Sequence, residues 1–321
     1  MKTIFRHFPK GTWILISTIV LMGGPSCLAY NTCTEEKGTY LGNAALDLDL
    51  RESVLRKVET PIGNLVSDAF LDYSRHILGC TPMPVEIGEA PNLTELGSGG
   101  QNCPVIALQN AGGIRQETAC GLREIIPEGP LYEKDIEDML PFANELWVVR
   151  LKGKDIKLLL EHSVESLGVI GIASEAGHFL QVSGVSFNVD CTATPQVLSA
   201  DQKQIATEGE RIANILVGRG AAVVSIEDDT EYEVVTNQFI ATGNDGFLGF
   251  LQRDEQNSVL TDSDNEPLTK AIPSQDTIQY EDNALRDSQA VKNWIEERHI
   301  EGLTVGRTAD DRITLAPSCA N

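Results

Sequence analysis

Two short stretches of the sequence carry residues that could bind a polar ligand. The first, Asn110–Arg115, follows the apolar run Pro104–Leu108, a pattern typical of a buried strand that ends in a tight turn. Its two adjacent glycines suit a positive φ or a close approach of backbone to ligand, while Asn110 and Arg115 add an amide and a guanidinium fork. On this hexapeptide alone, an ordinary hairpin with a solvated Arg115 is the favoured alternative.

The second stretch, Asn237–Phe247, has the same pattern of an apolar run followed by glycines, a carboxylate and aromatic residues. Asp245 could accept two hydrogen bonds from a vicinal diol such as a ribose, and the ring of Phe239 could stack on a base. Such stacking contributes roughly 1–3 kcal/mol and discriminates little among bases. For this turn taken alone, an Asn-Asp-Gly turn with Phe239 and Phe247 in the core is the favoured alternative.

The elements that must position these stretches follow from the apolar periodicity. Helical spacing predicts helices at 61–77, 132–140, 153–167 and 290–299, and period-two alternation predicts strands at 146–151, 179–189, 212–217 and 232–236. A cysteine, three prolines and a glycine cluster predict a long loop at 79–102. Antiparallel-looking strands mixed with helices at irregular intervals predict an α+β fold, a mixed sheet packed with helices.

The first 29 residues have the pattern of a secretory signal peptide. They combine basic residues, the apolar run Trp13–Met22 and small residues near Ala29. We therefore expect residues 1–29 to be removed and residues 30–321 to form one exported domain, in the periplasm or outside the cell. No later stretch is long and apolar enough to predict a membrane span.

The mature chain is strongly acidic. Removing Lys2, Arg6 and Lys10 with no acidic residue changes the formal charge from −22 to −25. A surface of this sign repels nucleic acid and anionic membranes, so neither is expected as a partner.

Six cysteines remain after cleavage, an even number that in an exported chain predicts up to three disulfides. Fifteen pairings are formally possible. We favour Cys80 with Cys103, which would close the loop between them. The spacing contains no CxxC pair, which argues against a zinc ribbon.

Taken together, the motifs strongly resemble the C-terminal domain of the exported 5'-nucleotidase and UDP-sugar hydrolase family. The resemblance covers roughly residues 47–315, and its specificity comes from several motifs in one order. They are Glu59–Leu65, Asn110–Arg115, Leu140–Asn144, Phe179–Val185, Phe239–Phe247 and the closing stretch Gly306–Ile313.

In that family this domain holds the nucleoside part of the substrate. The resemblance implies that Phe142 and Phe239 sandwich the base. It further implies that Asp245 accepts hydrogen bonds from the ribose hydroxyls and that Asn110 bonds the base or ribose edge.

The same resemblance implies that Arg115 and Arg56 lie toward the ribose and phosphate. It also implies that Gly112 and Gly113 shape the loop. Asn244 departs from the usual Gly-Gly-Asp-Gly turn of the family, which puts the backbone path beside the aspartate in question.

Family enzymes hydrolyse with a two-metal centre in a separate N-terminal domain. This chain has five histidines and no Asp-x-His, His-x-His or Gly-Asn-His run, so we expect no catalytic residue, metal ligand or cofactor here, and divalent metals only in a partner catalytic domain. For His76 and His162, within helical patterns, we expect surface or capping roles, and for Glu161 a structural role.

Three functional hypotheses remain open. The chain could be the nucleotide-recognising part of a 5'-nucleotidase-type hydrolase of nucleotide catabolism, dependent on a separate metallophosphoesterase chain. It could be a stand-alone, non-catalytic nucleoside or nucleotide binder. It could also be an interaction domain whose ligand site has decayed.

Overall fold

The larger sheet has five strands in the order β16, β8, β15, β3 and β9. Strands β3 and β15 are parallel neighbours, whereas the other pairs are antiparallel, so the sheet is mixed. Its strands are β16 (Thr269–Ala271), β8 (Leu146–Lys152), β15 (Glu231–Asn237), β3 (Ile106–Asn110) and β9 (Leu180–Ser183). Because β3 and β15 are parallel, their C-terminal ends meet at one edge of the sheet.

Among the described residues, a second sheet and four strand pairs make up the rest of the β structure. The second sheet has the order β14 (Ala222–Ser225), β13 (Ile212–Arg219), β10 (Val185–Val189) and β17 (Ile313–Leu315). The pairs are β1 (Tyr40–Ala44) with β7 (Gly129–Tyr132), β2 (Leu48–Asp49) with β6 (Ile125–Ile126), β4 (Glu117–Thr118) with β5 (Gly121–Leu122), and β11 (Val197–Leu198) with β12 (Ile205–Thr207).

These strands come from a computed structural model that describes residues 36–80, 103–168, 176–200, 204–219, 222–250, 269–271 and 284–319. They belong to one unit, Glu35–Asn321. The expected signal peptide and most of the expected loop at 79–102 lie outside the described residues.

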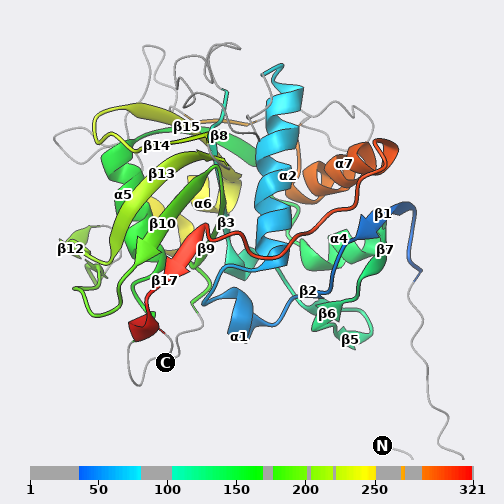
Figure 1. Cartoon of the computed structure of the whole chain (residues 1–321), viewed down its shortest axis with the longest axis horizontal. Helices are drawn as coiled ribbons and strands as arrows, with labels where there is room; N and C mark the ends of the chain where they lie inside the picture. Colours follow the sequence, from blue (N-terminus) through cyan, green and yellow to red (C-terminus); the bar gives the residue numbers. More distant parts are fainter. Residues whose placement is uncertain are drawn as a thin grey trace, which may run out of the picture. The chain divides into compact units, whose positions relative to one another are not determined.

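The helices are α1 (Glu52–Leu55), α2 (Pro61–Ile77), α4 (Glu133–Met139), α5 (Gly153–Ser163), α6 (Gln238–Ala241) and α7 (Asp287–Ile300). Three 3₁₀ turns accompany them, η1 (Ala111–Gly113), η2 (Asn244–Phe250) and η3 (Pro317–Cys319). Helix α2 packs against β3, β9 and α7, as Figure 1 shows for the long helix labelled α2. The predicted α+β fold is therefore confirmed, and none of the described helices is long and apolar enough to cross a membrane.

Helix α2 begins where the sequence predicts. Thr60 accepts a hydrogen bond from the Gly63 amide at 3.1 Å, and Pro61 occupies the first helical position. Most of α2 is buried, at polar as well as apolar positions. Asn64, Ser67 and Asp68 are as inaccessible as the apolar residues that recur at helical spacing.

One predicted strand, residues 179–189, is wrong as a single element. Gly184 has φ +73° and divides it into β9 in the larger sheet and β10 in the second sheet. A Cβ at this position would lie 2.0 Å from the Val105 carbonyl oxygen, so both conformation and space require glycine. Period-two alternation continues across the break, which is why the pattern does not reveal it.

The buried carboxylate of Asp68 on α2 joins both sheets. It accepts hydrogen bonds from Ser183 Oγ at 2.7 Å, Arg312 Nη1 at 2.8 Å and Arg219 Nη2 at 3.0 Å. Burial by itself would raise the pKa of Asp68, but the charges of Arg219 and Arg312 outweigh burial and hold that pKa well below its ordinary value. The carboxylate therefore remains ionised and links α2 to β9, to β13 and to the segment before β17.

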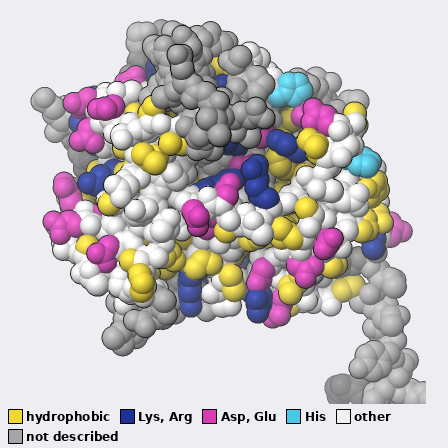
Figure 2. All heavy atoms as spheres, viewed as in Figure 1, with side chains coloured by type: hydrophobic (Ala, Val, Ile, Leu, Met, Phe, Trp, Pro, Cys, Tyr) yellow, Lys and Arg dark blue, Asp and Glu magenta, His cyan; other side chains and the backbone are white. Residues whose placement is uncertain are grey.

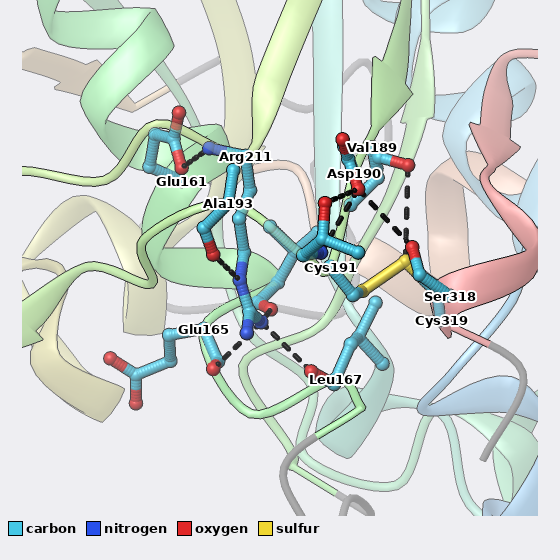
Figure 3. The surroundings of a disulfide bond; sticks show 12 residues. Glu161, Glu165, Leu167, Val189, Asp190, Cys191, Ala193, Arg211, Ser318 and Cys319 are labelled. Atoms are coloured by element: carbon cyan, nitrogen blue, oxygen red, sulfur yellow. Dashed lines mark hydrogen bonds between the residues drawn. A yellow bond between two sulfur atoms is a disulfide. The ribbon is translucent and has the colours of Figure 1, made fainter.

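Disulfides join segments that are distant in the sequence. The expected pair Cys80–Cys103 is confirmed, Cys191–Cys319 forms a second bond, and Cys120 is also disulfide-bonded. Figure 3 shows how Cys191–Cys319 attaches the end of the chain beside β10. Disulfides of this kind persist in oxidising compartments and favour an exported protein.

We expect Asp68→Asn to lower the free energy of unfolding by about 3–5 kcal/mol, because it leaves buried arginine charges without their carboxylate partner. Urea denaturation of the variant and the wild type would measure the loss. Asp229→Asn, at an exposed carboxylate paired with Lys154, is the matched control and should change stability little. An equal loss in the two variants would contradict the role given to Asp68.

Candidate functional site

The site is built where the parallel strands β3 and β15 end side by side. Asn110 is the last residue of β3 and Asn237 the last residue of β15. The buried Asn237 amide donates to Asn110 Oδ1 and to Gln109 Oε1, both at 2.9 Å, and its own oxygen caps α6 by accepting from the Ile240 amide at 2.9 Å. This amide network fixes the end of β3 relative to the helix that carries Phe239.

Asp245 lies in the turn after α6, beside the end of β3. Its backbone is left-handed, with φ 54° and ψ 27°, and its carbonyl oxygen lies 2.7 Å from His162 Nε2. Burial raises the pKa of the Asp245 carboxyl, while the charge of His162, a hydrogen bond from the Asn110 side chain and the charge of Arg56 each lower it. The structure thus brings Asp245, Asn110 and Arg56 together.

Asn244 stands in place of a glycine of the Gly-Gly-Asp-Gly turn, and the turn accommodates its side chain. Its side-chain amide donates to the Phe239 carbonyl at 3.0 Å and to Thr242 Oγ1 at 3.1 Å, so it closes the turn on α6. Asp245 takes the left-handed conformation that a glycine or a short polar residue accepts most readily.

Gly112 and Gly113 are needed for close packing within the chain. Neither has a positive φ, so that expected alternative is wrong. A Cβ on Gly112 would lie 3.0 Å from the Gly177 Cα, and one on Gly113 would lie 2.3 Å from Gln109 Nε2. The Gly112 amide donates to the Gly177 carbonyl at 2.8 Å, so Gly112 lets two backbone segments meet, while Gly113 leaves room for the Gln109 side chain.

Arg56 and Arg115 share one carboxylate that the sequence does not single out. Glu52 Oε1 lies 2.7 Å from Arg56 Nη2 and 3.2 Å from Arg115 Nη1. Arg115 also donates to Glu117 at 2.8 and 3.1 Å. The two arginines therefore lie on one side of the site, each partly neutralised by acidic neighbours.

The turn that carries Arg56 is fixed by hydrogen bonds with Gln181 of β9. The fully buried Gln181 amide donates to the Leu55 and Val58 carbonyls at 2.9 and 2.8 Å, and its oxygen accepts from the Thr60 amide at 3.1 Å. These three bonds satisfy backbone groups between α1 and α2 that would otherwise be buried without partners. The motif Phe179–Val185 contains Gln181, but nothing in the motif indicates that this side chain bonds the backbone between α1 and α2.

Two aromatic side chains are exposed at this edge. Phe142, in the loop after α4, is 57% exposed, and Phe239, in α6, is 36% exposed, whereas Phe247 is buried in the core. The two segments are adjacent, because Asn237 pairs with Leu146 and the Gln238 amide donates to the Glu145 carbonyl at 2.7 Å. The alternative that buries both Phe239 and Phe247 is therefore wrong for Phe239.

The loop that carries Phe142 is anchored to the start of α7. The Asp287 amide donates to the Asn144 carbonyl at 2.8 Å, and the Asn144 side-chain amide donates to Asp287 Oδ2 at 3.2 Å. Burial raises the pKa of Asp287 to about 6, although the Ser288 amide and both groups of Asn144 oppose that shift.

The expected surface or capping role fits His76 but not His162. His76 is exposed, with Nδ1 2.8 Å from Glu297, whereas His162 is buried and supports the Asp245 turn. The ring of His162 also stacks on His178 at 4.6 Å and meets Phe247 edge-on at 5.0 Å. Helical periodicity cannot reveal such a contact, because its partner lies about eighty residues away.

Helix α5, which carries His162, is fastened at its C-terminus by Arg211. The Arg211 guanidinium donates to the Val164 and Leu167 carbonyls, both at 2.8 Å. Figure 3 shows the guanidinium beside Glu165 and Leu167, in the segment that follows the helix. Glu161 accepts from the Arg211 and Ile212 amides at 3.0 and 2.8 Å, which confirms its structural role. A cation at a helix C-terminus stabilises the free carbonyls there.

Among the described residues, no three histidine, cysteine or carboxylate side chains are placed to hold a metal ion. The side chains that meet at the edge of β3 and β15 are amides, the Asp245 carboxylate, two arginines with their acidic partners Glu52 and Glu117, and phenyl rings. This set can stack an aromatic ring, accept from hydroxyl groups and attract an anion, which together are the requirements of a nucleoside or nucleotide.

Comparisons with known proteins point in the same direction. A family model described as the 5'-nucleotidase C-terminal domain matches residues 40–252. The chain is 25% identical over 222 residues to the trifunctional nucleotide phosphoesterase YfkN of Bacillus subtilis, covering 69% of this chain and 12% of that protein. It is 26% identical over 211 residues to human 5'-nucleotidase, covering 64% of this chain and 30% of that protein.

A solved structure shares the fold. The 5'-nucleotidase precursor of Thermus thermophilus aligns with a TM-score of 0.57 and 25% identity, covering 87% of this chain and 40% of that one. The chain thus spans less than half the length of that structure and of the two relatives above.

We expect the stability of the wild type to rise relative to Asp287→Asn as pH falls from about 6 to about 4. The folded-state pKa of Asp287 is about 6, above the ordinary 3.8, so the folded chain binds this proton more tightly than the unfolded chain. The relative gain is up to about 3 kcal/mol, measured by urea denaturation across this pH range. Parallel stability profiles for the two proteins would contradict the assignment.

Proposed function

Because the chain belongs to the 5'-nucleotidase C-terminal domain family, whose model matches residues 40–252, we propose that it recognises a nucleoside or nucleotide. The observation that carries this proposal is the meeting of Asp245, Asn110 and Arg56 at the ends of two parallel strands, beside two exposed phenyl rings. Each group matches a different part of one ligand.

In the proposed complex the base stacks between Phe142 and Phe239. Both rings are exposed in the free chain, so their faces are available without rearrangement of the core. Stacking on aromatic faces tolerates any base, so the choice among bases falls to polar groups such as Asn110. Asn110 Oδ1 already accepts from Asn237, which holds the side chain in one orientation toward the ligand.

The ribose hydroxyls donate to the Asp245 carboxylate in this arrangement. An ionised carboxylate is acceptor-only, whereas protonation turns one of its oxygens into a donor. Burial raises the pKa of Asp245, and a bound diol would favour the charged form by hydrogen bonding, so binding should release a proton when the pH lies near that raised pKa.

In the proposed complex Arg56 and Arg115 bind the phosphate of a nucleotide. In the free chain both contact Glu52 Oε1, at 2.7 and 3.2 Å, and Arg115 also pairs with Glu117. A phosphate must compete with these carboxylates, which lowers the net gain from binding it. We therefore propose that the base and ribose provide most of the affinity and that the phosphate adds a smaller increment.

For hydrolysis we propose a separate metallophosphoesterase chain in the same exported compartment, periplasmic or extracellular. The described side chains do not form a metal cluster, so no catalytic step is assigned to them. A stand-alone, non-catalytic binder is the second candidate, and the acid-paired arginines favour it because they suit a nucleoside as well as a nucleotide.

Calorimetric titration of the purified chain with adenosine and with AMP, in the presence of divalent metal and with phosphate release followed in the same sample, tests the proposal. Binding without release supports recognition by this chain and directs the search to a partner. Release by the chain alone would overturn the dependence on a partner, and absence of any binding would overturn the proposal in favour of a decayed site.

Phe239→Ala should weaken adenosine binding by roughly 1–3 kcal/mol, the range expected for a lost stacking ring. Calorimetry would measure the change, with circular dichroism to verify the fold. Tyr40→Ala, at a similarly exposed aromatic residue on β1, is the control and should bind as the wild type does. Unchanged affinity in Phe239→Ala would remove this ring from the site.

Adenosine affinity should fall as pH drops through the raised pKa of Asp245, because the protonated carboxyl accepts fewer hydrogen bonds. Asp245→Asn should bind more weakly at neutral pH and lose this dependence. Phe239→Ala should keep the dependence at lower affinity. A wild type and an Asp245→Asn variant with the same pH profile would exclude a direct bond to Asp245.

A further inference from the structure

A cavity lies away from the ends of β3 and β15, between α2, α7 and the segment Leu303–Arg307. It has a volume of about 180 Å³. Figure 2, in the orientation of Figure 1, shows basic side chains gathered near the middle of the face over α2. The cavity is lined by Asn64, Leu65, Asp68, Trp294, Arg298, Leu303, Thr304, Val305, Gly306 and Arg307.

Two guanidinium groups at this cavity retain donors for a ligand. Arg307 is 55% exposed and contacts Asp68 Oδ2 only at 3.5 Å, which is longer than a good hydrogen bond. Arg298 donates through Nη2 to Asp72 at 3.1 Å and stacks on the Trp294 ring at 4.5 Å, which fixes the plane of its guanidinium. Planar, pre-oriented guanidinium groups suit carboxylates and phosphates.

Asn64 on α2 lines the cavity in a fixed orientation. It is 1% exposed, and its Nδ2 donates to Glu59 Oε1 at 2.6 Å and to Asp310 Oδ1 at 3.3 Å. Those bonds fix the amide orientation, because only the nitrogen can donate to two carboxylates. The wall that α2 contributes at this position is therefore held in place by neighbouring side chains.

The one carboxylate that lines the cavity does not exclude an anion. Asp68 is already paired with Arg219 and Arg312, and Arg307 lies near it as well. Asp72, bound by Arg219 and Arg298, is compensated in the same way, and Asp310 takes a further pair with Arg312. Asp68, Asp72, Asp310 and Glu59 are thus matched in number by Arg219, Arg312, Arg298 and Arg307, of which Arg298 and Arg307 line the cavity.

The remaining wall is largely apolar, formed by Leu65, Trp294 and Leu303 among others. We propose that this cavity binds a small organic anion, a carboxylate or phosphate ester. The anionic group lies against Arg298 and Arg307, and the carbon skeleton lies on the apolar wall.

This site is separate from the proposed nucleoside site and does not depend on it. None of its lining residues comes from the ends of β3 and β15 or from the turn with Asp245. A substitution at either site should therefore leave ligand binding at the other unchanged.

Calorimetric titration of the purified chain with malate and with glycerol 3-phosphate tests the proposal and distinguishes the two anion types. At least one of them should bind, and Arg307→Gln should weaken that binding about tenfold or more, the effect expected for a lost charge-assisted hydrogen bond. Leu303→Glu, a change at a half-exposed position, should also weaken it, because it places a negative charge at the cavity.

The matched control is Arg51→Gln, which removes an arginine of similar exposure, 46%, paired with Asp49 outside the cavity. Arg51→Gln and Phe239→Ala should bind the anion as the wild type does. No binding of either anion, equal binding by Arg307→Gln and the wild type, or an equal loss in Arg51→Gln would overturn the proposal. Loss of binding in Arg115→Gln with none in Arg307→Gln would assign the anion to the nucleotide site and would also overturn it.

Discussion

The buried carboxylate of Asp68 is the interaction on which the arrangement of the described elements depends. A charge in the interior is stable only when partners surround it, and here those partners come from β9, from β13 and from the segment before β17. Satisfying one carboxylate therefore requires α2 and parts of both sheets to meet at one place. The apolar core accounts for compactness, whereas this ion cluster specifies which elements are neighbours.

Buried polar groups with hydrogen-bond partners inside the chain also support the proposed nucleoside site. The turn before α2 is held by Gln181, whose amide is fully buried against backbone groups, and that turn positions Arg56. On the other side, Asn237 connects the ends of β15 and β3. Groups proposed to touch a ligand are thus supported by amides that make their full set of bonds within the chain, so the ligand meets a preformed surface.

Much of the fold could be predicted from the sequence, because its signals are local. The cap at Thr60, the proline after it and the helical spacing through Ile77 predict α2. Short-range periodicity also predicts α4, α5 and α7 and the strands β8, β13 and β15, whereas α1, α6 and most of the short strands were not predicted. The break at Gly184 could not be predicted, since the alternation of apolar residues continues through it while the strand changes sheet. The burial of His162 was also missed, because it depends on a partner turn far along the chain.

The sequence by itself determined the family, the α+β class and the candidate residues, because ordered motifs and periodicity are properties of neighbouring positions. Only the tertiary structure decided that Phe239 is exposed while Phe247 is buried, that Gly112 and Gly113 make room for Gly177 and Gln109, and that Glu52 holds both site arginines. It also created the cavity at Arg298 and Arg307, which brings residues of the motifs Glu59–Leu65 and Gly306–Ile313 together with α7. The physical reason is common to all four: burial, steric contact and ion pairing act between groups that meet only after the chain has folded.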